Sequence, residues 1–157
     1  DEDYYRRIEA IQFTMSHDDG KKTGDLSNSD VILLGVSRTS KTPTSIYLAN
    51  RGFKTTNIPL VPNQEIPEDL KSKNFKSCVI GLFADPDRLS DIRRNRVALM
   101  KENRSSNYTD INSIKKEVEE SKNLFKKYNW PTIDVTRKSV EETAASIIKI
   151  IEIKKNK

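Results

Sequence analysis

The length, charge and cysteine content of the chain exclude several classes of protein at the outset. Its 157 residues suit one domain of ordinary size, and no apolar run of about 18 residues or more is present to span a membrane as a helix. A single cysteine, Cys78, excludes an internal disulfide framework and fits a reducing cytoplasm, and a single histidine makes a multi-histidine metal site a poor hypothesis. We therefore expect a single cytoplasmic domain without a membrane partner.

The positive charge of the chain does not by itself indicate nucleic-acid binding. The formal net charge is +5 and the isoelectric point is near 9.2. The basic residues mostly alternate with acidic ones, as in residues 114–128, which is typical of a solvated helix face. No stripe of mixed aromatic and basic residues is visible. We therefore expect no nucleic-acid partner.

The first half of the chain alternates between helical and strand patterns. Apolar residues on one side of residues 3–13 predict a helix, and the Gly-, Asp- and Ser-rich residues 16–30 predict a loop. The apolar run of residues 30–35 is typical of a fully buried parallel strand. Residues 42–52 then predict a short helix, because a proline is tolerated in the first turn and Gly52 can end the helix. Residues 53–61 predict a second strand.

The second half repeats this alternation. Residues 77–85 predict a buried strand, residues 87–102 a helix and residues 103–110 a loop. The helix expected at 110–128 has the clearest amphipathic spacing, and residues 132–136 predict a short strand. Ser139 and Glu142 have the spacing of a capping box at the start of a last helix. The whole pattern predicts an α/β fold, a P-loop kinase-like three-layer domain with a mainly parallel sheet.

A near match to a phosphate-binding motif follows the strand at 30–35. The pattern G-x-x-x-x-G-K-[ST] is met except that a serine replaces its second glycine. Backbone amides and the helix N-terminus would converge on an anion, Lys41 would reach the terminal phosphate, and the Thr42 hydroxyl would bind Mg²⁺. An exposed lysine in an ordinary strand-to-helix connection is the alternative. The expected nucleotide-binding residues are Gly35, Val36, Ser37, Arg38, Thr39, Ser40, Lys41 and Thr42.

Acidic residues in two loops are candidates for acid–base or metal chemistry. Phosphoryl transfer to a hydroxyl needs a proton acceptor, which Asp18 or Asp19 of the sequence HDDG could provide while the other binds Mg²⁺ or braces the loop. We favour Asp18 as the base, and a simple Asp-Asp-Gly turn is the alternative. His17 is expected to be a surface residue. Asp85, at the end of an apolar run, could hold Mg²⁺ through water or could cap the helix that Pro86 begins.

Two arginines of the helix expected at 87–102 fall within its apolar arc. Arg93 and Arg96 share this face with Leu89 and Ile92. A buried guanidinium requires an anion, so the partner is either a carboxylate of the protein or a phosphate in the active site. Both alternatives stay open at this point. In the second, the two arginines would be catalytic, because they would stabilise the transferring phosphoryl group.

Longer stretches resemble a known family. Residues 7–20, 30–52 and 130–144 closely resemble the regulatory proteins of pyruvate, phosphate dikinase, whose bacterial relatives act on phosphoenolpyruvate synthase. The loop form GVSRTSKTP is similar to that of this family, so Ser40 is no defect there. Members are longer, so the resemblance implies that residues 1–157 are the C-terminal catalytic domain of a protein with a further N-terminal domain.

The resemblance also implies an activity and its partners. Such proteins use ADP to phosphorylate a threonine of the dikinase or the synthase, and remove this phosphate with inorganic phosphate, giving pyrophosphate. ADP, Mg²⁺, inorganic phosphate and pyrophosphate are thus the expected cofactors and substrates. A homo-oligomer is compatible with the sequence. A small-molecule P-loop kinase and a non-catalytic nucleotide-sensing module are the alternative functions.

Overall fold

The computed structural model describes residues 1–20 and 24–156. Helices and strands alternate along most of the chain, as the sequence predicts. The helices are α1 (Glu2–Ser16), α2 (Lys41–Asn50), α3 (Pro86–Met100), α4 (Ile111–Lys127) and α5 (Val140–Lys155). The strands are β1 (Val31–Gly35), β2 (Thr55–Pro59), β3 (Cys78–Phe83) and β4 (Thr132–Asp134).

The four strands form one sheet with the order β2-β1-β3-β4, and every neighbouring pair is parallel. The sheet register pairs Val31 of β1 with Thr55 of β2 and with Cys78 of β3. All five residues of β1 are buried, as expected for the central strand of a sheet covered on both faces. The prediction of a mainly parallel sheet is confirmed.

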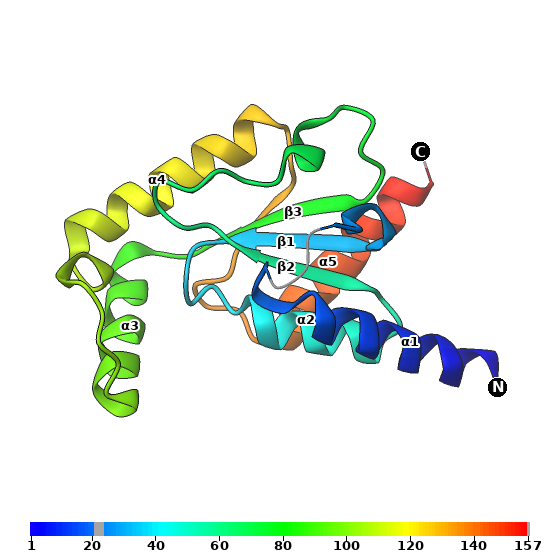
Figure 1. Ribbon diagram of the computed structural model, residues 1–157, viewed down its shortest axis with the longest axis horizontal. Coiled ribbons are helices and arrows are strands. Elements are labelled where there is room, and N and C mark those ends of the chain that lie inside the picture. Colours follow the sequence, from blue (N-terminus) through cyan, green and yellow to red (C-terminus); the bar gives the residue numbers. More distant parts are fainter. Residues whose placement is uncertain (21–23, 157) are drawn as a thin grey trace.

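Helices cover both faces of the sheet and complete a three-layer arrangement (Figure 1). On one face, Leu33 and Ile80 pack with Leu48 of α2 and Ile147 of α5. On the other face, β1 side chains pack with Phe125 of α4 and with apolar residues from the loops. Phe125 lies directly on Gly81 of β3, where a Cβ atom would meet the ring at 2.4 Å.

Side chains cap the N-termini of α3, α4 and α5. Ser139 accepts a hydrogen bond from the Glu142 amide, and Glu142 accepts one from the Ser139 amide, so the capping box is confirmed. Asp110 and Asp85 cap α4 and α3 in the same way through their carboxylates. Residues 21–23 of the predicted loop lie outside the described residues. Within the described part of the chain, no helix is both long and apolar enough to cross a membrane.

The topology places one loop at the centre of the carboxyl edge of the sheet. Residues 35–42 connect β1 to α2, and α3 extends beyond the same edge (Figure 1). In parallel α/β sheets, ligands bind in crevices at this edge. The candidate site is therefore built around this loop.

Candidate functional site

The loop of residues 35–42 is held in shape by its own hydrogen bonds. The Thr39 hydroxyl donates to the Val36 carbonyl at 2.9 Å, and both residues are buried. A Cβ atom at position 35 would lie 2.5 Å from Thr39 Oγ1 and 2.9 Å from the Leu82 carbonyl oxygen. Only glycine fits there, because the loop turns back against β3 immediately after β1. The first glycine of the motif thus has a packing role in this structure.

Ser40, which replaces the second glycine of the motif, adopts a left-handed conformation with φ 62° and ψ 27°. Arg38 does the same with φ 71°. A residue with a Cβ atom pays roughly 1–2 kcal/mol for this conformation. The loop therefore keeps a glycine-like path at position 40 in spite of the serine.

Replacing Ser40 with glycine is expected to stabilise the protein by about 1 kcal/mol, because glycine adopts positive φ without steric cost. The serine side chain makes no capping hydrogen bond in the described structure, so no contact of this kind is lost. Thermal unfolding should show a midpoint raised by about 2–4 °C. The matched control is Ser45→Gly inside α2, which should lower the midpoint. An unchanged or lower midpoint for Ser40→Gly would contradict a strained backbone at this position.

Lys41 is the first residue of α2 and its side chain is almost fully buried, at 6% exposure. Its ammonium folds back over the loop and donates to the Val36 carbonyl at 2.9 Å and to Thr39 Oγ1 at 3.4 Å. Burial lowers the pKa of Lys41 from 10.5 to about 8; Asp19 and Asp18 oppose this shift, while Arg38 and Arg93 add to it. The alternative of an exposed lysine is excluded. A buried cation of this kind is suited to receive an anion.

The lowered pKa of Lys41 predicts a dependence of stability on pH. Because the folded protein binds this proton less tightly than the unfolded chain, the protonated lysine destabilises the fold below pH 8. As the pH rises from about 8 to 10.5, this destabilisation is relieved, and the free energy of unfolding should increase by on the order of 1 kcal/mol per pH unit. Denaturant unfolding of wild type and Lys41→Met should therefore show a stability difference that shifts in favour of the wild type across this window. A constant difference would contradict a lowered pKa.

Asp18, Thr42 and Asn57 form a polar cluster beside the loop. The Thr42 hydroxyl donates to Asp18 Oδ1 at 2.9 Å, and Asn57 Nδ2 donates to the same oxygen at 2.8 Å and to Thr42 Oγ1 at 2.9 Å. Asn57 Oδ1 is buried and has no hydrogen-bond partner among the described residues. Because Thr42 gives its proton to Asp18, a lone pair of its oxygen is free for a cation. These oxygens fit a hydrated Mg²⁺, which prefers oxygen ligands and keeps several waters.

Asp19 differs from its neighbour in both exposure and contacts. It adopts a left-handed conformation with φ 55°, is exposed, and lines the same cavity as Lys41 and Thr42. The HDDG segment is anchored by His17, which is 1% exposed and whose Nε2 lies 2.6 Å from Asp25 Oδ1. The expectation of a surface histidine is wrong, because the ring stacks on Phe13 of α1. The two aspartates therefore face different surroundings.

The cavity over the loop has a volume of about 690 Å³ and is lined mainly by polar and basic residues. Arg96 of α3 contributes to it, as does Arg104 from the segment after α3. Arg96 is less buried than the helical arc predicts, because its side chain is 41% exposed and its Nε donates to Glu102 at 3.3 Å. The cavity thus brings Asp19 and Arg96 together with five residues of the loop, Ser37, Arg38, Ser40, Lys41 and Thr42.

Arg93 is fully buried and already has a carboxylate partner. Its guanidinium donates to both oxygens of Glu117, at 2.9 and 3.3 Å, and to the carbonyls of Ser37 and Tyr108. Tyr108 also places its hydroxyl 2.9 Å from Ser37 Oγ. Of the two sequence-based alternatives, the structure shows the protein carboxylate. Arg93 therefore connects the loop to α4 and does not line the cavity over the loop.

Asp85 lies away from this cluster, so the structure does not support the expectation that it holds Mg²⁺ with Thr42. Its carboxylate accepts a hydrogen bond from the Arg88 amide at 3.2 Å and caps α3. It lines a different hollow, together with Asp134 and Arg137. The helix-cap alternative is the one that the structure shows, because the side chain turns toward its own helix.

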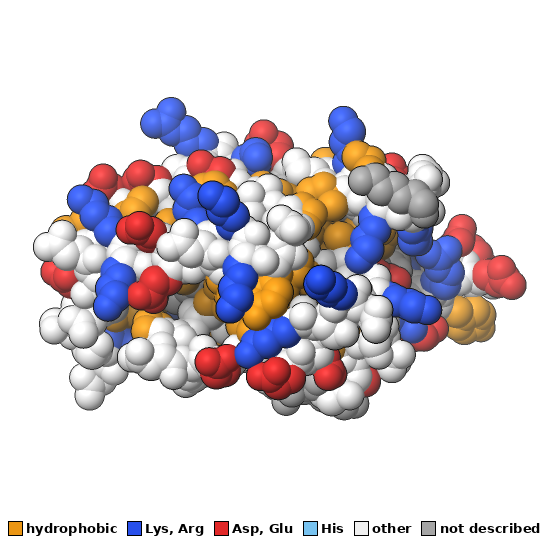
Figure 2. Space-filling view, turned by 90° about the horizontal axis from the view of Figure 1, so that it is seen from above, with side chains coloured by type: hydrophobic (Ala, Val, Ile, Leu, Met, Phe, Trp, Pro, Cys, Tyr) orange, Lys and Arg blue, Asp and Glu red, His pale blue; other side chains and the backbone are white. Residues whose placement is uncertain are grey.

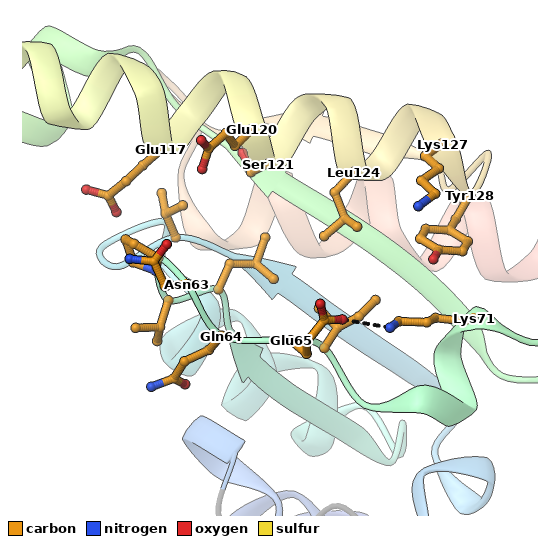
Figure 3. Close-up of a pocket in the computed structure, with 15 residues that line it drawn as sticks. Asn63, Gln64, Glu65, Lys71, Glu117, Glu120, Ser121, Leu124, Lys127 and Tyr128 are labelled. Atoms are coloured by element: carbon orange, nitrogen blue, oxygen red, sulfur yellow. Dashed lines mark hydrogen bonds and ion pairs between the residues drawn. The ribbon is translucent and has the colours of Figure 1, made fainter.

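Another hollow, of about 300 Å³, lies between α4 and the segment that follows β2 (Figure 3). Glu117, Ser121 and Leu124 point from α4 toward this segment, and Glu65 pairs with Lys71 at 2.8 Å across its end. The hollow shares Val61 with the cavity over the loop. On the face of the molecule in Figure 2, Lys and Arg side chains are interspersed with Asp and Glu side chains.

The sequence did not single out several residues of this site. Asn57 is a polar residue within a buried strand, and this pattern could have indicated it. Tyr108 and Arg104 belong to a segment that the sequence predicts only as a loop. The Tyr108 hydroxyl contacts Ser37, which lies 71 positions earlier in the chain, and local sequence patterns do not indicate a contact over such a separation.

The all-parallel sheet, with helices on both faces and a buried lysine at the start of α2, is an α/β fold consistent with a three-layer P-loop-like domain. The chain belongs to the kinase/pyrophosphorylase family, which it matches over residues 1–148. The resemblance found in the sequence is thereby confirmed.

Similar proteins carry the name of pyruvate, phosphate dikinase regulatory protein. The relative from Pelagibacter ubique (strain HTCC1062) is 68% identical over 155 residues, covering 99% of this chain and 57% of the relative. Those from Caulobacter vibrioides and Maricaulis maris are 51% and 52% identical, covering 95% and 99% of this chain but 47% and 55% of the relatives. The chain thus spans about half the length of the curated relatives it matches.

Proposed function

We propose that this chain is the phosphotransfer domain of a bifunctional regulator of pyruvate, phosphate dikinase. In one direction it transfers the β-phosphoryl group of ADP to a threonine of the dikinase. In the other it transfers the same group from phosphothreonine to inorganic phosphate. The observation that carries this proposal is the buried, back-folded Lys41 in the loop of residues 35–42, in a chain of the kinase/pyrophosphorylase family.

The loop provides the proposed phosphate cradle. Its backbone amides and the N-terminus of α2 would offer partial positive charge to an anion, and Lys41 would add a full charge. Thr42, Asp18 and Asn57 would hold a hydrated Mg²⁺ through the oxygens described above. This ion would neutralise charge on the phosphate oxygens during transfer. The described part of the chain contains no cluster of three or more His, Cys, Asp or Glu side chains that could hold a metal ion. The Mg²⁺ would therefore be held largely through water.

The two aspartates receive different roles in this proposal. Asp18 is held by Thr42 and Asn57, which suits the metal side of the site, whereas Asp19 faces the cavity. Asp19 is therefore our candidate for the proton acceptor, the reverse of the assignment that the sequence favoured. In the forward direction, the threonine oxygen forms a bond to the β-phosphorus, the bridging P–O bond breaks, AMP leaves, and Asp19 takes the hydroxyl proton. In the reverse direction, phosphate attacks phosphothreonine, and Asp19 returns the proton to the departing threonine oxygen.

The direct test uses the full-length protein and ADP labelled at its β-phosphate. Incubation with pyruvate, phosphate dikinase is expected to place the label on a threonine of the dikinase, and added inorganic phosphate should release it as pyrophosphate. Phosphoenolpyruvate synthase is the parallel target to test. A label found on a small metabolite would instead support the small-molecule kinase. Tight ADP binding without any transfer would support a nucleotide-sensing module.

A further inference from the structure

Four basic residues line the cavity over the loop, and only some of them belong to the proposed cradle. Arg38, Lys41, Arg96 and Arg104 line it, and Asp19 is the one acidic residue among its lining residues in the described structure. Lys41 and the loop amides already form the proposed cradle. The two arginines that follow along the chain, Arg96 and Arg104, are therefore left for another anion.

These two arginines are paired with the same carboxylate. Arg96 Nε lies 3.3 Å from Glu102 Oε1, and Arg104 Nε lies 3.1 Å from Glu102 Oε2. Their hydrogen bonds, that of Arg104 foremost, hold the pKa of Glu102 below its usual range. A carboxylate bridged by two guanidinium groups has the geometry in which proteins bind a phosphate, since phosphate oxygens accept the same paired donors. The Glu102 carboxylate thus lies where a bound phosphate would accept hydrogen bonds from the same two guanidinium groups.

Tyr108 holds one of these arginines in place. The Arg104 guanidinium carbon lies 4.7 Å from the centroid of the Tyr108 ring, and the buried Arg93 lies 4.8 Å from the same centroid. The Tyr108 hydroxyl contacts Ser37 Oγ of the loop. Arg104 is therefore stacked on a ring that is fixed to the loop and to the buried Arg93–Glu117 pair, although its side chain is 51% exposed. The segment after α3 is thereby docked beside the cradle.

We propose that Arg96 and Arg104 form a second phosphate site in this cavity, which Glu102 fills while no phosphate is bound. The inference rests on the proposed function, because phosphorolysis brings two phosphates together and each carries up to two negative charges. The ligand is a phosphate dianion, supplied as inorganic phosphate or as the phosphothreonine side chain of the protein substrate. Two phosphates in one cavity repel each other unless cations lie beside both.

The proposal predicts effects of opposite sign for neighbouring residues. Removing the charge of Arg96 or Arg104 should weaken phosphate binding at least about tenfold, because a charge-assisted contact is lost. Glu102→Gln should strengthen it several-fold, because the competing carboxylate is gone. A purely structural ion-pair cluster would show no such gain. ADP affinity should change less than about threefold in all three variants, since Lys41 and the loop are unaltered.

The test is calorimetric titration of the full-length protein with inorganic phosphate, O-phospho-L-threonine and, in parallel, ADP. The variants are Arg96→Gln, Arg104→Gln and Glu102→Gln, and the matched control is Arg94→Gln, an exposed arginine of α3 that does not line the cavity. Losses for phosphate alone would assign the site to the incoming phosphate, and losses for phosphothreonine alone would assign it to the protein substrate. Equal losses would show that it accepts both.

Unchanged phosphate and phosphothreonine affinities in both arginine variants, or weaker binding in Glu102→Gln, would overturn the second site. These outcomes are separate from the proposed function. Arginine-dependent phosphate binding without any transfer from ADP would leave the site standing and remove the phosphotransfer activity. Phosphoryl transfer from ADP, combined with phosphate binding that does not depend on the two arginines, would leave the phosphotransfer activity standing and remove the second site.

Discussion

Replacing Lys41 with alanine is expected to abolish binding of nucleotide phosphates and both directions of the proposed reaction. Each direction places a phosphate group in the same cradle, from ADP in the forward reaction and from pyrophosphate as it forms in the reverse. Lys41 is the buried cation of this cradle, so its loss should weaken ADP binding by about a hundredfold or more. Titration with ADP and single-turnover rates in both directions would measure this effect.

The Lys41 prediction can be separated from a loss of folding. Because burial disfavours the charged ammonium, Lys41→Met should fold at least as stably as the wild type at neutral pH while losing phosphate binding. The control is Lys116→Ala, since Lys116 lies on α4 with 78% of its side chain exposed. A Lys41 variant that loses transfer yet keeps full phosphorolysis would mean that the two reactions use different sites.

The two aspartates of the HDDG segment are expected to fail in different ways. Asp18→Asn should weaken the Mg²⁺-dependent binding of ADP by about 10–100-fold, because Thr42 loses the charged oxygen that accepts its proton. Asp19→Asn should bind Mg²⁺ and ADP normally but lower turnover by roughly 10²–10⁴-fold in both directions, since the proton has no acceptor or donor. Asparagine tolerates the left-handed conformation of position 19, so the backbone should be preserved.

ADP titrations at several Mg²⁺ concentrations, combined with single-turnover rates, distinguish the two variants. Exchanged phenotypes would make Asp18 the base, as the sequence favoured. Normal rates in both variants would reduce the segment to a structural turn and require another proton acceptor.

The elements of the fold were predictable because each carries a local signal. The wholly apolar β1, the capping box at Ser139 and the spacing of apolar residues in α4 identify a strand and two helices without knowledge of their neighbours. The strand order β2-β1-β3-β4 depends on contacts between distant segments, so local patterns do not contain it. The same distinction applies within the site.

The loop of residues 35–42 was predictable because its motif is contiguous and follows a strand. The ion-pair partners of the nearby Arg93 and Arg96 were not predictable. A helical wheel places both Arg93 and Arg96 toward the core, but it cannot show that Glu117 lies opposite Arg93 while Arg96 reaches Glu102. The alternatives for Asp85 and for the two aspartates had the same origin, because side-chain direction is set by packing between elements.

The internal hydrogen bonds of the loop have a consequence for ligands of very different size. Thr39 and Lys41 both donate to the Val36 carbonyl, so the cradle has its shape before any phosphate arrives. A ligand that meets a preorganised site loses no binding energy to ordering the chain. A nucleotide could offset such a loss through its base and ribose, whereas inorganic phosphate has only its four oxygens. A rigid cradle is therefore the form of site that lets a bare anion and a nucleotide compete on comparable terms.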